Sequence, residues 1–469
     1  MKVILGGGIG GLSAAYYLRN KFPHELVKLY ESSSFVGGWI KSRKLPNGTI
    51  FEQGPRTLRP KGEPGYNTLQ LVDDLGLSDK IVPIRSSHPA AKTRMIYVNE
   101  KLHVLPFSLP EIFKTISPFS KPLISYILND LKAERKTIRN NDESIYSFVE
   151  RRFGTDIAQY AISPLICGIC AGNSKEISVK FLMKNFFEKE QKYGSVVKGV
   201  IYDMWKKGFK RPSDVASTLV DIAKNEKWSV YSFEGGMETL TRTLHDKIKD
   251  KDVDVVLASV CNKIDFVDNT AILTMNGHTQ QNVAKHVISS LPAPNLSDLI
   301  QHQHPVLAKD LRQIPSVNVA VINLYYKGHL HLDEAFGFLV PPSENLPILG
   351  VIYDSCCFPN DTGTVLTVMM GGHWFNQRFG TNPTEEYLLN TATDQLRNIL
   401  KIKVEPDNYK VNILKNCIPQ YVVGHCERVQ RIEQYIKDHQ LPLSICGSSY
   451  YGVGVNDVIL SAKNAVEEI

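Results

Sequence analysis

The chain has 469 residues, of which 43% are hydrophobic and 22% are charged, and it carries a formal net charge of +6. This length predicts two or three domains of about 150 residues each. The composition is that of a soluble globular protein and excludes a disordered, collagen-like or polytopic membrane chain. The modest positive charge gives no nucleic-acid signature and is compatible with an anionic ligand or an acidic membrane surface.

Apolar runs and cysteines indicate the cellular environment that the sequence predicts for the chain. No secretory signal is recognisable, because Met1 and Lys2 lead directly into a short apolar strand. No apolar run reaches the ~18 residues that a membrane-spanning helix needs, so any membrane contact is expected at the surface. The eight cysteines show no regular spacing. They predict reduced or buried thiols in an intracellular protein.

The first 31 residues predict a βαβ unit, in which a glycine-rich turn joins a strand to a helix and a second strand follows. The two strands and the helix are expected at 2–5, 26–31 and 12–19. The turn carries the motif Gly6-x-Gly8-x-x-Gly11, and Glu31 ends the second strand. Glycines let main chain approach a pyrophosphate at the helix N-terminus, and a carboxylate accepts hydrogen bonds from a ribose diol but repels a 2′-phosphate. The pattern therefore predicts a dinucleotide site that disfavours NADP.

The rest of the chain divides into a helical part and a sheet-forming part. From 105 to about 205 prolines interrupt a helical pattern, with apolar residues at helical spacing over 121–139 and 144–161. From 316 onward apolar residues alternate, which predicts an antiparallel sheet. Its expected strands lie at 317–326, 337–340, 349–353 and 364–370. A short strand at 443–446 and a helix after Asn456 are expected near the end of the chain.

Glycine-rich segments recur at 37–39, 54–56, 232–237 and 447–457. With the N-terminal turn, they resemble the FAD-dependent amine-oxidase-like superfamily. The resemblance implies FAD as cofactor, with the N-terminus of the last helix pointing at the part of the flavin where negative charge collects. The cofactor-binding residues that it implies are Gly6, Gly7, Gly8, Ile9, Gly10, Gly11, Glu31, Ser32, Gly38, Trp39, Gly54, Pro55, Arg56, Thr57, Val260, Val453, Gly454 and Val455.

A second nucleotide motif is not recognisable in the sequence. No other Gly-x-Gly-x-x-Gly follows a predicted strand, so a nicotinamide site is not expected. A flavoprotein without such a site must be reoxidised by another acceptor, and dioxygen is the simplest one. The sequence therefore favours an oxidase over a reductase.

Blocks spread over nearly the whole chain resemble the protoporphyrinogen oxidase family of the haem pathway. These blocks lie at 31–33, 37–40, 54–56, 88–94, 118–122, 171–174, 416–421 and 452–457. The resemblance implies oxidation of protoporphyrinogen IX to protoporphyrin IX. Six hydrogens leave in three rounds, and each round passes electrons through FAD to dioxygen and releases hydrogen peroxide. Because the cofactor carries this chemistry, no catalytic side chain is expected.

The same resemblance implies an α/β fold with three parts. These are a Rossmann-type FAD-binding domain of the amine-oxidase-like superfamily, an antiparallel-sheet substrate-binding domain and an inserted α-helical membrane-binding domain. The expected FAD-binding domain is discontinuous and takes 1–86, 226–292 and 415–469. The substrate-binding domain takes 87–97 and 293–414, and the helical domain takes 98–225.

The implied substrate is a wide apolar macrocycle with two propionates, so its pocket needs an apolar slot and at least one cation. Arg94 matches the family's propionate-contacting arginine, and a guanidinium can hold a carboxylate bidentately. The other substrate-binding residues implied by the resemblance are Gly168, Phe336, Gly337, Leu339 and Met369. From residue type alone, an arginine is more often part of a solvated surface, and Phe336, Leu339 and Met369 suit an ordinary sheet core.

Other constellations carry weaker signals. Cys167-Gly168-Ile169-Cys170 has the spacing of a redox dithiol, but the family chemistry uses none, so inert thiols are expected. His302-x-His304 has no Cys or carboxylate close by in the sequence, and His329-x-His331 is followed by Asp333 but nothing else marks a ligand set, so no metal is predicted. Two alternatives to the oxidation of protoporphyrinogen stay open. One is an FAD-dependent amine oxidase of the same superfamily, and the other is a non-catalytic interaction protein similar to GDP-dissociation inhibitors.

The family resemblance also implies a location and partners. It implies peripheral attachment to the mitochondrial inner membrane, on the intermembrane-space side. Over 105–131, aromatic and aliphatic residues that include Phe113 and Phe119 lie among lysines and suit an interfacial helix pair, with a buried helix pair as the alternative. The expected partners are protoporphyrinogen IX, dioxygen, this membrane surface, ferrochelatase and a second copy of the chain in a homodimer. No nucleic acid is expected.

Overall fold

The chain forms two compact units, each built from segments that are distant in the sequence. The computed structural model describes residues 1–106, 109–134, 142–207, 218–276, 282–358 and 362–469. The first unit comprises Met1–Arg85, Val215–Pro315 and Glu427–Ile469, and the second comprises Ser86–Asp214 and Ser316–Cys426. Among the described residues, no helix combines the length and apolar character needed to cross a bilayer.

A five-stranded parallel sheet forms the centre of the first unit. Its strands, in spatial order, are β19 (Leu443–Ile445), β13 (His286–Ser289), β1 (Lys2–Leu5), β2 (Val27–Tyr30) and β9 (Asp254–Val256). Val3 and Ile4 point to opposite faces, where they join two separate apolar clusters. Such burial on both faces explains why the strands read as continuous apolar runs. The sequence predicted β1, β2 and β19 correctly.

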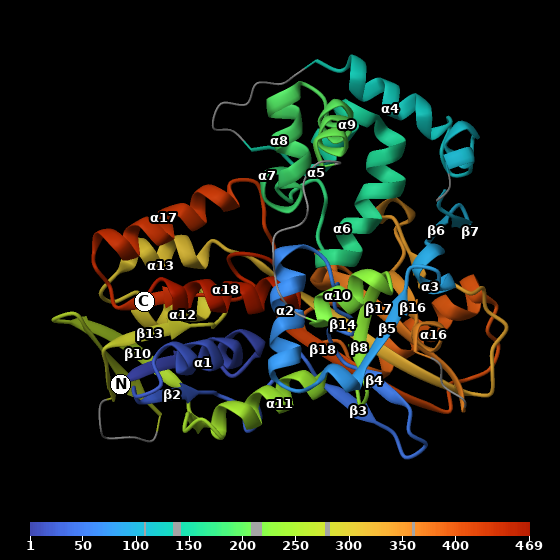
Figure 1. Cartoon of the computed structure of the whole chain (residues 1–469). Helices are drawn as coiled ribbons and strands as arrows, with labels where there is room; N and C mark the ends of the chain where they lie inside the picture. Colours follow the sequence, from blue (N-terminus) through green and yellow to red (C-terminus); the bar gives the residue numbers. More distant parts are fainter. Residues whose placement is uncertain (107–108, 135–141, 208–217, 277–281, 359–361) are drawn as a thin grey trace. The chain divides into compact units, whose positions relative to one another are not determined.

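Helices such as α1 and α11 lie against this sheet (Figure 1), and the unit also contains smaller sheets. The apolar cluster that contains Ile4 includes side chains of α1 (Ile9–Lys21), α11 (Glu238–Lys249) and α18 (Val455–Glu467). The helices that complete the unit are α2 (Gly62–Asp74), η1 (Ser78–Lys80), α10 (Thr218–Asn225), α12 (Ala293–Ile300), α13 (Pro305–Arg312) and α17 (His425–Asp438), which begins at the unit boundary. The remaining strands are β3 (Ser42–Lys44), β4 (Ile50–Glu52), β5 (Ile81–Arg85), β8 (Trp228–Phe233), β10 (Cys261–Val267), β11 (Thr270–Met275) and β12 (Asn282–Ala284).

A seven-stranded sheet dominates the second unit. Its strands, in spatial order, are β18 (Asn408–Pro419), β14 (Ser316–Lys327), β17 (Gly363–Gly372), β16 (Ile348–Tyr353), β15 (Gly337–Leu339), β6 (Met95–Val98) and β7 (Lys101–Val104). All neighbouring pairs are antiparallel except β15 and β6, which are parallel. The antiparallel sheet predicted from alternating residues is therefore confirmed, with two further strands supplied by 95–104.

The two faces of the seven-stranded sheet carry different clusters. On one face, residues such as Ile322, Val368 and Val351 pack with Leu388, Ala392 and Leu396 of α16 (Glu385–Leu400). The other face carries Val319, Val321 and Leu349, which pack with Cys167 and Ala171. Short helices α3 (Pro89–Lys92), η4 (Pro342–Glu344), α14 (Asp354–Cys357) and α15 (Phe375–Phe379) connect the strands.

The helical part of the second unit is held by buried charges as well as by apolar contacts. Its elements are η2 (Leu109–Phe113), α4 (Leu123–Lys132), α5 (Ile145–Phe153), the π-helix η3 (Ile157–Ile162), α6 (Ser163–Cys170), α7 (Val179–Leu182), α8 (Lys184–Tyr193) and α9 (Val196–Lys207). Arg152 forms ion pairs with Asp130 and Glu190, and all three side chains are fully buried. Arg151 joins Glu190 to Glu143 at 2.6 and 2.5 Å.

The helices predicted from this part of the sequence are shorter than expected. The helix expected over 121–139 is α4, which ends at Lys132, and 135–139 lie outside the described residues. The single helix expected over 144–161 is two elements, because Gly154 ends α5 with a φ of 98° before η3 begins. A residue with positive φ cannot continue a right-handed helix, and glycine adopts that conformation at little cost.

Candidate active site

The glycine-rich turn after β1 depends on one main-chain contact. Gly6 has a φ of +99°, and an added Cβ at Gly11 would lie 1.8 Å from the Gly6 carbonyl oxygen. Only glycine at position 11 lets the first turn of α1 pack against the end of β1. Ser290 completes the turn, because its hydroxyl donates to the carbonyl oxygens of Leu5 and Gly6 at 2.9 and 3.2 Å. Sequence reasoning missed Ser290, which lies in no glycine motif.

Beyond this contact, the turn opens into a cradle for an anion. An added Cβ at Gly8 would have one neighbour within 4 Å, the Cα of Gly38 at 3.9 Å. The Gly37 N–H donates to the Gly7 carbonyl oxygen at 2.8 Å, so the second glycine segment lies directly beside the first. Helix α1 has neither a side-chain N-cap nor an acidic residue in its first turn. Its N-terminal N–H groups and positive dipole end therefore suit a pyrophosphate.

Glu31 is fixed at the same turn. One carboxylate oxygen accepts a hydrogen bond from the Gly7 N–H at 2.6 Å. The other accepts from the N–H and hydroxyl of Ser33, both at 2.8 Å, and from the hydroxyl of Ser32 at 3.3 Å. The Glu31 carbonyl accepts from the Ser259 N–H, which places Val260 next to this end of β2. A carboxylate held in this way beside an anion cradle fits the ribose of a dinucleotide.

The N-terminus of α18 comes to the same end of the sheet. An added Cβ at Gly10 would lie 3.2 Å from a methyl group of Val458, so the first turns of α1 and α18 pack together. Gly454 is the N-cap of α18 and provides no side-chain cap, and Val455 begins the helix. Burial raises the pKa of Asp457 in this turn, although a backbone hydrogen bond opposes the shift. Val453 and Gly454 thus present main chain beside the cradle.

The segment at 54–57 packs against the second glycine pair. An added Cβ at Gly54 would lie 2.0 Å from the Trp39 carbonyl oxygen, so these main chains touch. Arg56 is 8% exposed, whereas Trp39 is 43% exposed. Every residue expected to bind the cofactor belongs to the first unit, and the contacts above gather most of them around the end of β1. The cradle, the anchored acid and the two helix N-termini fit FAD.

The expected substrate-binding residues all belong to the second unit. The Arg94 guanidinium lies over the Phe336 ring, 4.8 Å from its centroid, and its Nη1 donates to the Ala90 carbonyl oxygen at 3.3 Å. Both side chains are partly exposed. The arrangement leaves a planar cation on an aromatic ring, with edge nitrogens that suit a carboxylate.

Leu339 and Met369 lie in one row across the seven-stranded sheet. Leu339 pairs with Gly350, Gly350 pairs with Met369, and Met369 pairs with Val321, so their side-chain positions share one face. Helix α6 lies over this row, because an added Cβ at Gly168 would be 3.0 Å from Leu339. Gly337 has a φ of +132°, and a Cβ there would lie 2.0 Å from the Val351 carbonyl oxygen. The face is apolar, and Arg94 directly precedes β6, the strand that pairs with β15.

The two cysteines on α6 are buried thiols. All eight cysteines of the chain are free, and Cys167 and Cys170 belong to the interior. Burial raises the pKa of both thiols to about 12. Because the thiolate is the reactive form, neither side chain has the properties of a redox dithiol at neutral pH. This supports the expectation that the pair is inert.

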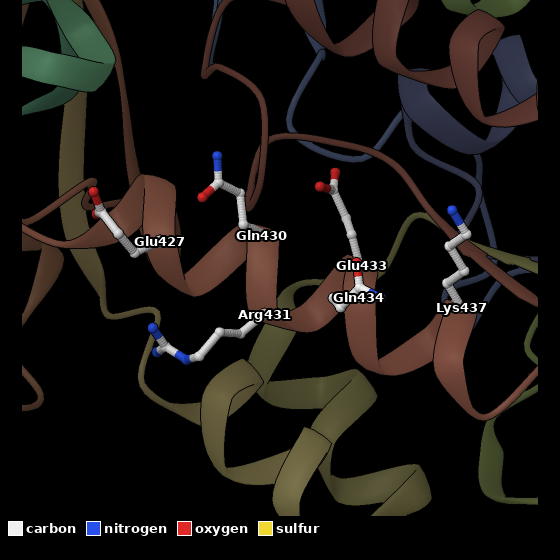
Figure 2. A pocket seen from close by; sticks show the side chains of 6 residues that line it. All are labelled: Glu427, Gln430, Arg431, Glu433, Gln434 and Lys437. Atoms are coloured by element: carbon white, nitrogen blue, oxygen red, sulfur yellow. The ribbon is translucent and has the colours of Figure 1, made fainter. Parts of the chain in front are cut away.

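Other polar clusters offer no comparable site. In the described part of the chain, no group of three or more His, Cys, Asp or Glu residues could hold a metal ion. A hollow lies along α17, and Figure 2 shows the side chains that line it: Glu427, Gln430, Arg431, Glu433, Gln434 and Lys437. Arg431 pairs with Asp310, and Glu433 accepts a hydrogen bond from Tyr451 at 2.7 Å. Since its charges are mixed, the hollow favours no ligand of one sign.

A substitution at Gly8 should separate cofactor binding from folding. Gly8→Ala adds a methyl group that meets only ordinary contact in the protein, at 3.9 Å, but faces the side from which a pyrophosphate approaches. We expect an unchanged thermal midpoint of the apoprotein and a roughly ten- to hundredfold weaker FAD affinity, measured by flavin fluorescence titration. Gly11→Ala is the contrasting variant, because its methyl group would overlap the Gly6 carbonyl and disturb the apoprotein itself. Full FAD affinity in Gly8→Ala would contradict the assigned cradle.

Comparisons with known proteins agree with this geometry. The model of the family of flavin-containing amine oxidoreductases matches residues 9–469. The chain is 38% identical to protoporphyrinogen oxidase of Bos taurus, over 100% of this chain and 98% of the relative. It is 32% identical to protoporphyrinogen oxidase of Schizosaccharomyces pombe, over 99% and 98%. A crystal structure of an Exiguobacterium protein superposes with a TM-score of 0.80 at 22% identity, over 100% of this chain and 98% of the other.

The family model covers all but the first strand and part of the turn, and the two relatives cover the chain almost from end to end. The structure adds the cradle, the anchored Glu31 and the converging helix N-termini that such a flavoprotein needs. The chain therefore belongs to the flavin-containing amine oxidoreductases and, within them, to the protoporphyrinogen oxidase family.

Proposed function

We propose that the chain oxidises protoporphyrinogen IX to protoporphyrin IX in haem biosynthesis, with FAD as cofactor and dioxygen as electron acceptor. The observation that carries the proposal is Arg94 on the Phe336 ring, at the end of an apolar sheet face that α6 covers. The proposal is supported by the 38% and 32% identity to protoporphyrinogen oxidases, which extends over almost the whole chain. An amine oxidase would need no such cation, and an interaction protein without flavin would not need the cradle at Gly8 and Glu31.

The residues of this chain bind and orient, and FAD supplies the redox chemistry by accepting substrate hydrogens in three rounds and passing the electrons to dioxygen, which leaves as hydrogen peroxide. Arg94 holds a propionate through its planar donors. Leu339 and Met369, both partly exposed, offer an apolar surface to the macrocycle and exclude water from it. Without a side chain at Gly168, α6 lies directly against Leu339, where an added Cβ would come within 3.0 Å.

We also propose that the helical part of the second unit lies on a membrane surface. Large apolar side chains are exposed on one face of α9, where Ile201, Met204 and Trp205 are 60%, 70% and 75% exposed. Phe113, at the end of η2, is 68% exposed. Positions 201, 204 and 205 share one side of a helix. Exposed aromatic and aliphatic residues on a helix that also carries lysines suit the interface of a bilayer.

One residue expected at this surface is placed elsewhere. Phe119 is only 5% exposed and packs edge-on against Tyr126, at 6.3 Å between ring centroids. Its apolar side chain is used inside the helical part, so Phe119 cannot enter a membrane. Phe107 lies outside the described residues. Attachment to the mitochondrial inner membrane on its intermembrane-space side, an interaction with ferrochelatase and a homodimer stay predictions that rest on the family resemblance.

The acceptor can be tested with purified flavoprotein. Under anaerobic conditions, protoporphyrinogen should bleach the flavin absorbance, and air should restore it with release of hydrogen peroxide. NADPH alone should leave the absorbance unchanged, because the sequence shows no second nucleotide motif besides the one assigned to FAD. Rapid bleaching by NADPH would overturn the assignment as an oxidase.

Arg94→Ala should weaken substrate binding. We expect KM to rise roughly ten- to hundredfold, the value of one charge-assisted pair, with some loss of kcat because a misplaced macrocycle meets the flavin badly. Arg94→Lys should restore part of the affinity, since a lysine cannot bind a carboxylate bidentately. Steady-state kinetics measure both effects.

A substrate with esterified propionates is the control for Arg94. Wild-type protein should bind it poorly, and Arg94→Ala should lose little further with it, while flavin content stays normal. If Arg94→Ala handled the free acid as wild type does, the propionate contact would lie elsewhere.

Charge on the exposed face of α9 should release the protein from lipid. Met204→Glu with Trp205→Glu should lower binding to vesicles of phosphatidylcholine and phosphatidylglycerol at least about tenfold, measured by flotation. Val404→Glu is the matched control, because Val404 is 58% exposed in the same unit but outside the helical part. Equal binding by the α9 variant and wild type would place the membrane contact elsewhere or nowhere.

A further inference from the structure

The main-chain carbonyl that accepts the hydrogen bond from the Arg94 guanidinium belongs to a single turn of helix. Helix α3 spans Pro89–Lys92, and Arg94 follows it by two residues. Within this turn the Thr93 N–H donates to the Pro89 carbonyl oxygen at 2.8 Å. A helix this short has too few internal hydrogen bonds to be stable by itself, so its end groups decide whether it forms.

His88 is the N-cap of α3. Its Nδ1 accepts a hydrogen bond from the Ala90 N–H at 3.2 Å. Ala90 is fully buried, so water cannot readily replace the ring nitrogen as acceptor. The usual N-cap residues are Ser, Thr, Asp and Asn, as Ser144, Ser178 and Thr384 illustrate in this unit. The His88 imidazole thus caps α3 in the way that the hydroxyls of serine and threonine cap other helices of this unit.

The same residue, Ala90, connects His88 to Arg94. Its N–H donates to His88, and its carbonyl oxygen accepts from Arg94 Nη1 at 3.3 Å. The Arg94 main chain is held separately, because its carbonyl oxygen accepts from the Leu105 N–H at 2.8 Å at the start of the β6–β7 hairpin. Loss of the cap should therefore disturb the direction of the guanidinium on Phe336 without displacing the strand.

We propose that His88 is a positioning residue for substrate binding, which orients Arg94 toward a propionate through the N-cap of α3 and the carbonyl of Ala90. The inference rests on the proposed function, in which Arg94 binds the propionate. In this proposal His88 acts through Arg94 and not by contact with cofactor or substrate. It sets the fraction of molecules whose guanidinium is ready to receive a carboxylate.

The test combines kinetics with equilibrium binding of protoporphyrin IX, followed by porphyrin fluorescence. His88→Ala should raise KM and Kd about three- to tenfold, the size expected for a lost N-cap, with kcat changed less and flavin content unchanged. His88→Asn should restore both values, because asparagine supplies an acceptor to the same N–H. In His88→Ala with Arg94→Ala, both values should equal those of Arg94→Ala alone, since His88 acts only through Arg94.

Thr384→Ala is the matched control. It removes a comparable N-cap, in which the Thr384 hydroxyl accepts from the Tyr387 N–H at 3.1 Å, on the exposed start of α16. Its KM and Kd should be those of wild type. If His88→Ala does not fold, His88→Leu fills the same space without an acceptor and takes its place.

Three results would overturn the proposal: a wild-type Kd in His88→Ala, no recovery in His88→Asn, or a double variant whose loss is the product of the single losses. Failure of the proposed function is distinguishable, because wild-type protein would then not oxidise protoporphyrinogen at all. The protoporphyrin Kd series would still decide whether His88 acts through Arg94.

Discussion

The packing of Gly11 against the Gly6 carbonyl is the constraint on which the cofactor end of this protein depends. The 1.8 Å that would separate an added Cβ from that oxygen leaves no alternative to glycine. Once the turn is closed, the N-terminus of α1 faces outward, Glu31 reaches the Gly7 N–H, and Gly37 joins the turn from the other side. Helix α18 then packs at Gly10 with its own N-terminus at the same place. Two dipole ends and one anchored acid thus follow from one close contact.

Much of the cofactor site could be predicted from sequence because its parts are close together in the chain. Strand β1, the turn, α1 and β2 lie within 31 consecutive residues, and the glycine spacing reports the turn directly. Ser290 could not be predicted in the same way, since its hydroxyl reaches Leu5 and Gly6 across more than half of the chain. A lone serine after a strand gives no signal until the sheet order that places β13 beside β1 is known.

The expected substrate-binding residues of the second unit, in contrast, depend on contacts between segments that are distant in the sequence. The alternation of β14 and β17 predicted a sheet, but nothing in the local sequence predicted that β6 would join β15 in parallel. That pairing brings Arg94 to Phe336, from segments more than two hundred residues apart. Arg94 could be singled out only by family resemblance, because an isolated arginine is usually a surface residue. The cap by His88 depends on the same folding of the 88–94 block and was not predicted from its residues.

The helical part places charges inside and apolar side chains outside. Arg152, Asp130 and Glu190 are fully buried, whereas Met204 and Trp205 are among the most exposed large side chains of the chain. Asp130 also accepts hydrogen bonds from the Ser195 hydroxyl and the Val197 N–H, at 2.6 and 2.8 Å, which fixes the start of α9. Arg152 and Asp130 and their hydrogen-bond partners are separated by 22 to 67 positions, so no local sequence pattern predicted these pairs.

This arrangement explains how α9 can leave its apolar face exposed. Burial alone would raise the pKa of Glu190, but Arg151 and Arg152 lower it overall, so the carboxylate is ionised at neutral pH. A depressed folded-state pKa contributes stability that is present above the unfolded pKa and is lost as pH falls through the folded one. Breaking such a buried pair typically costs about 3–5 kcal/mol, because a partner is left charged and unpaired. The ion network therefore orders α4, α5, α8 and the start of α9 without burying Ile201, Met204 and Trp205. These side chains remain exposed and can contact an apolar phase outside the protein.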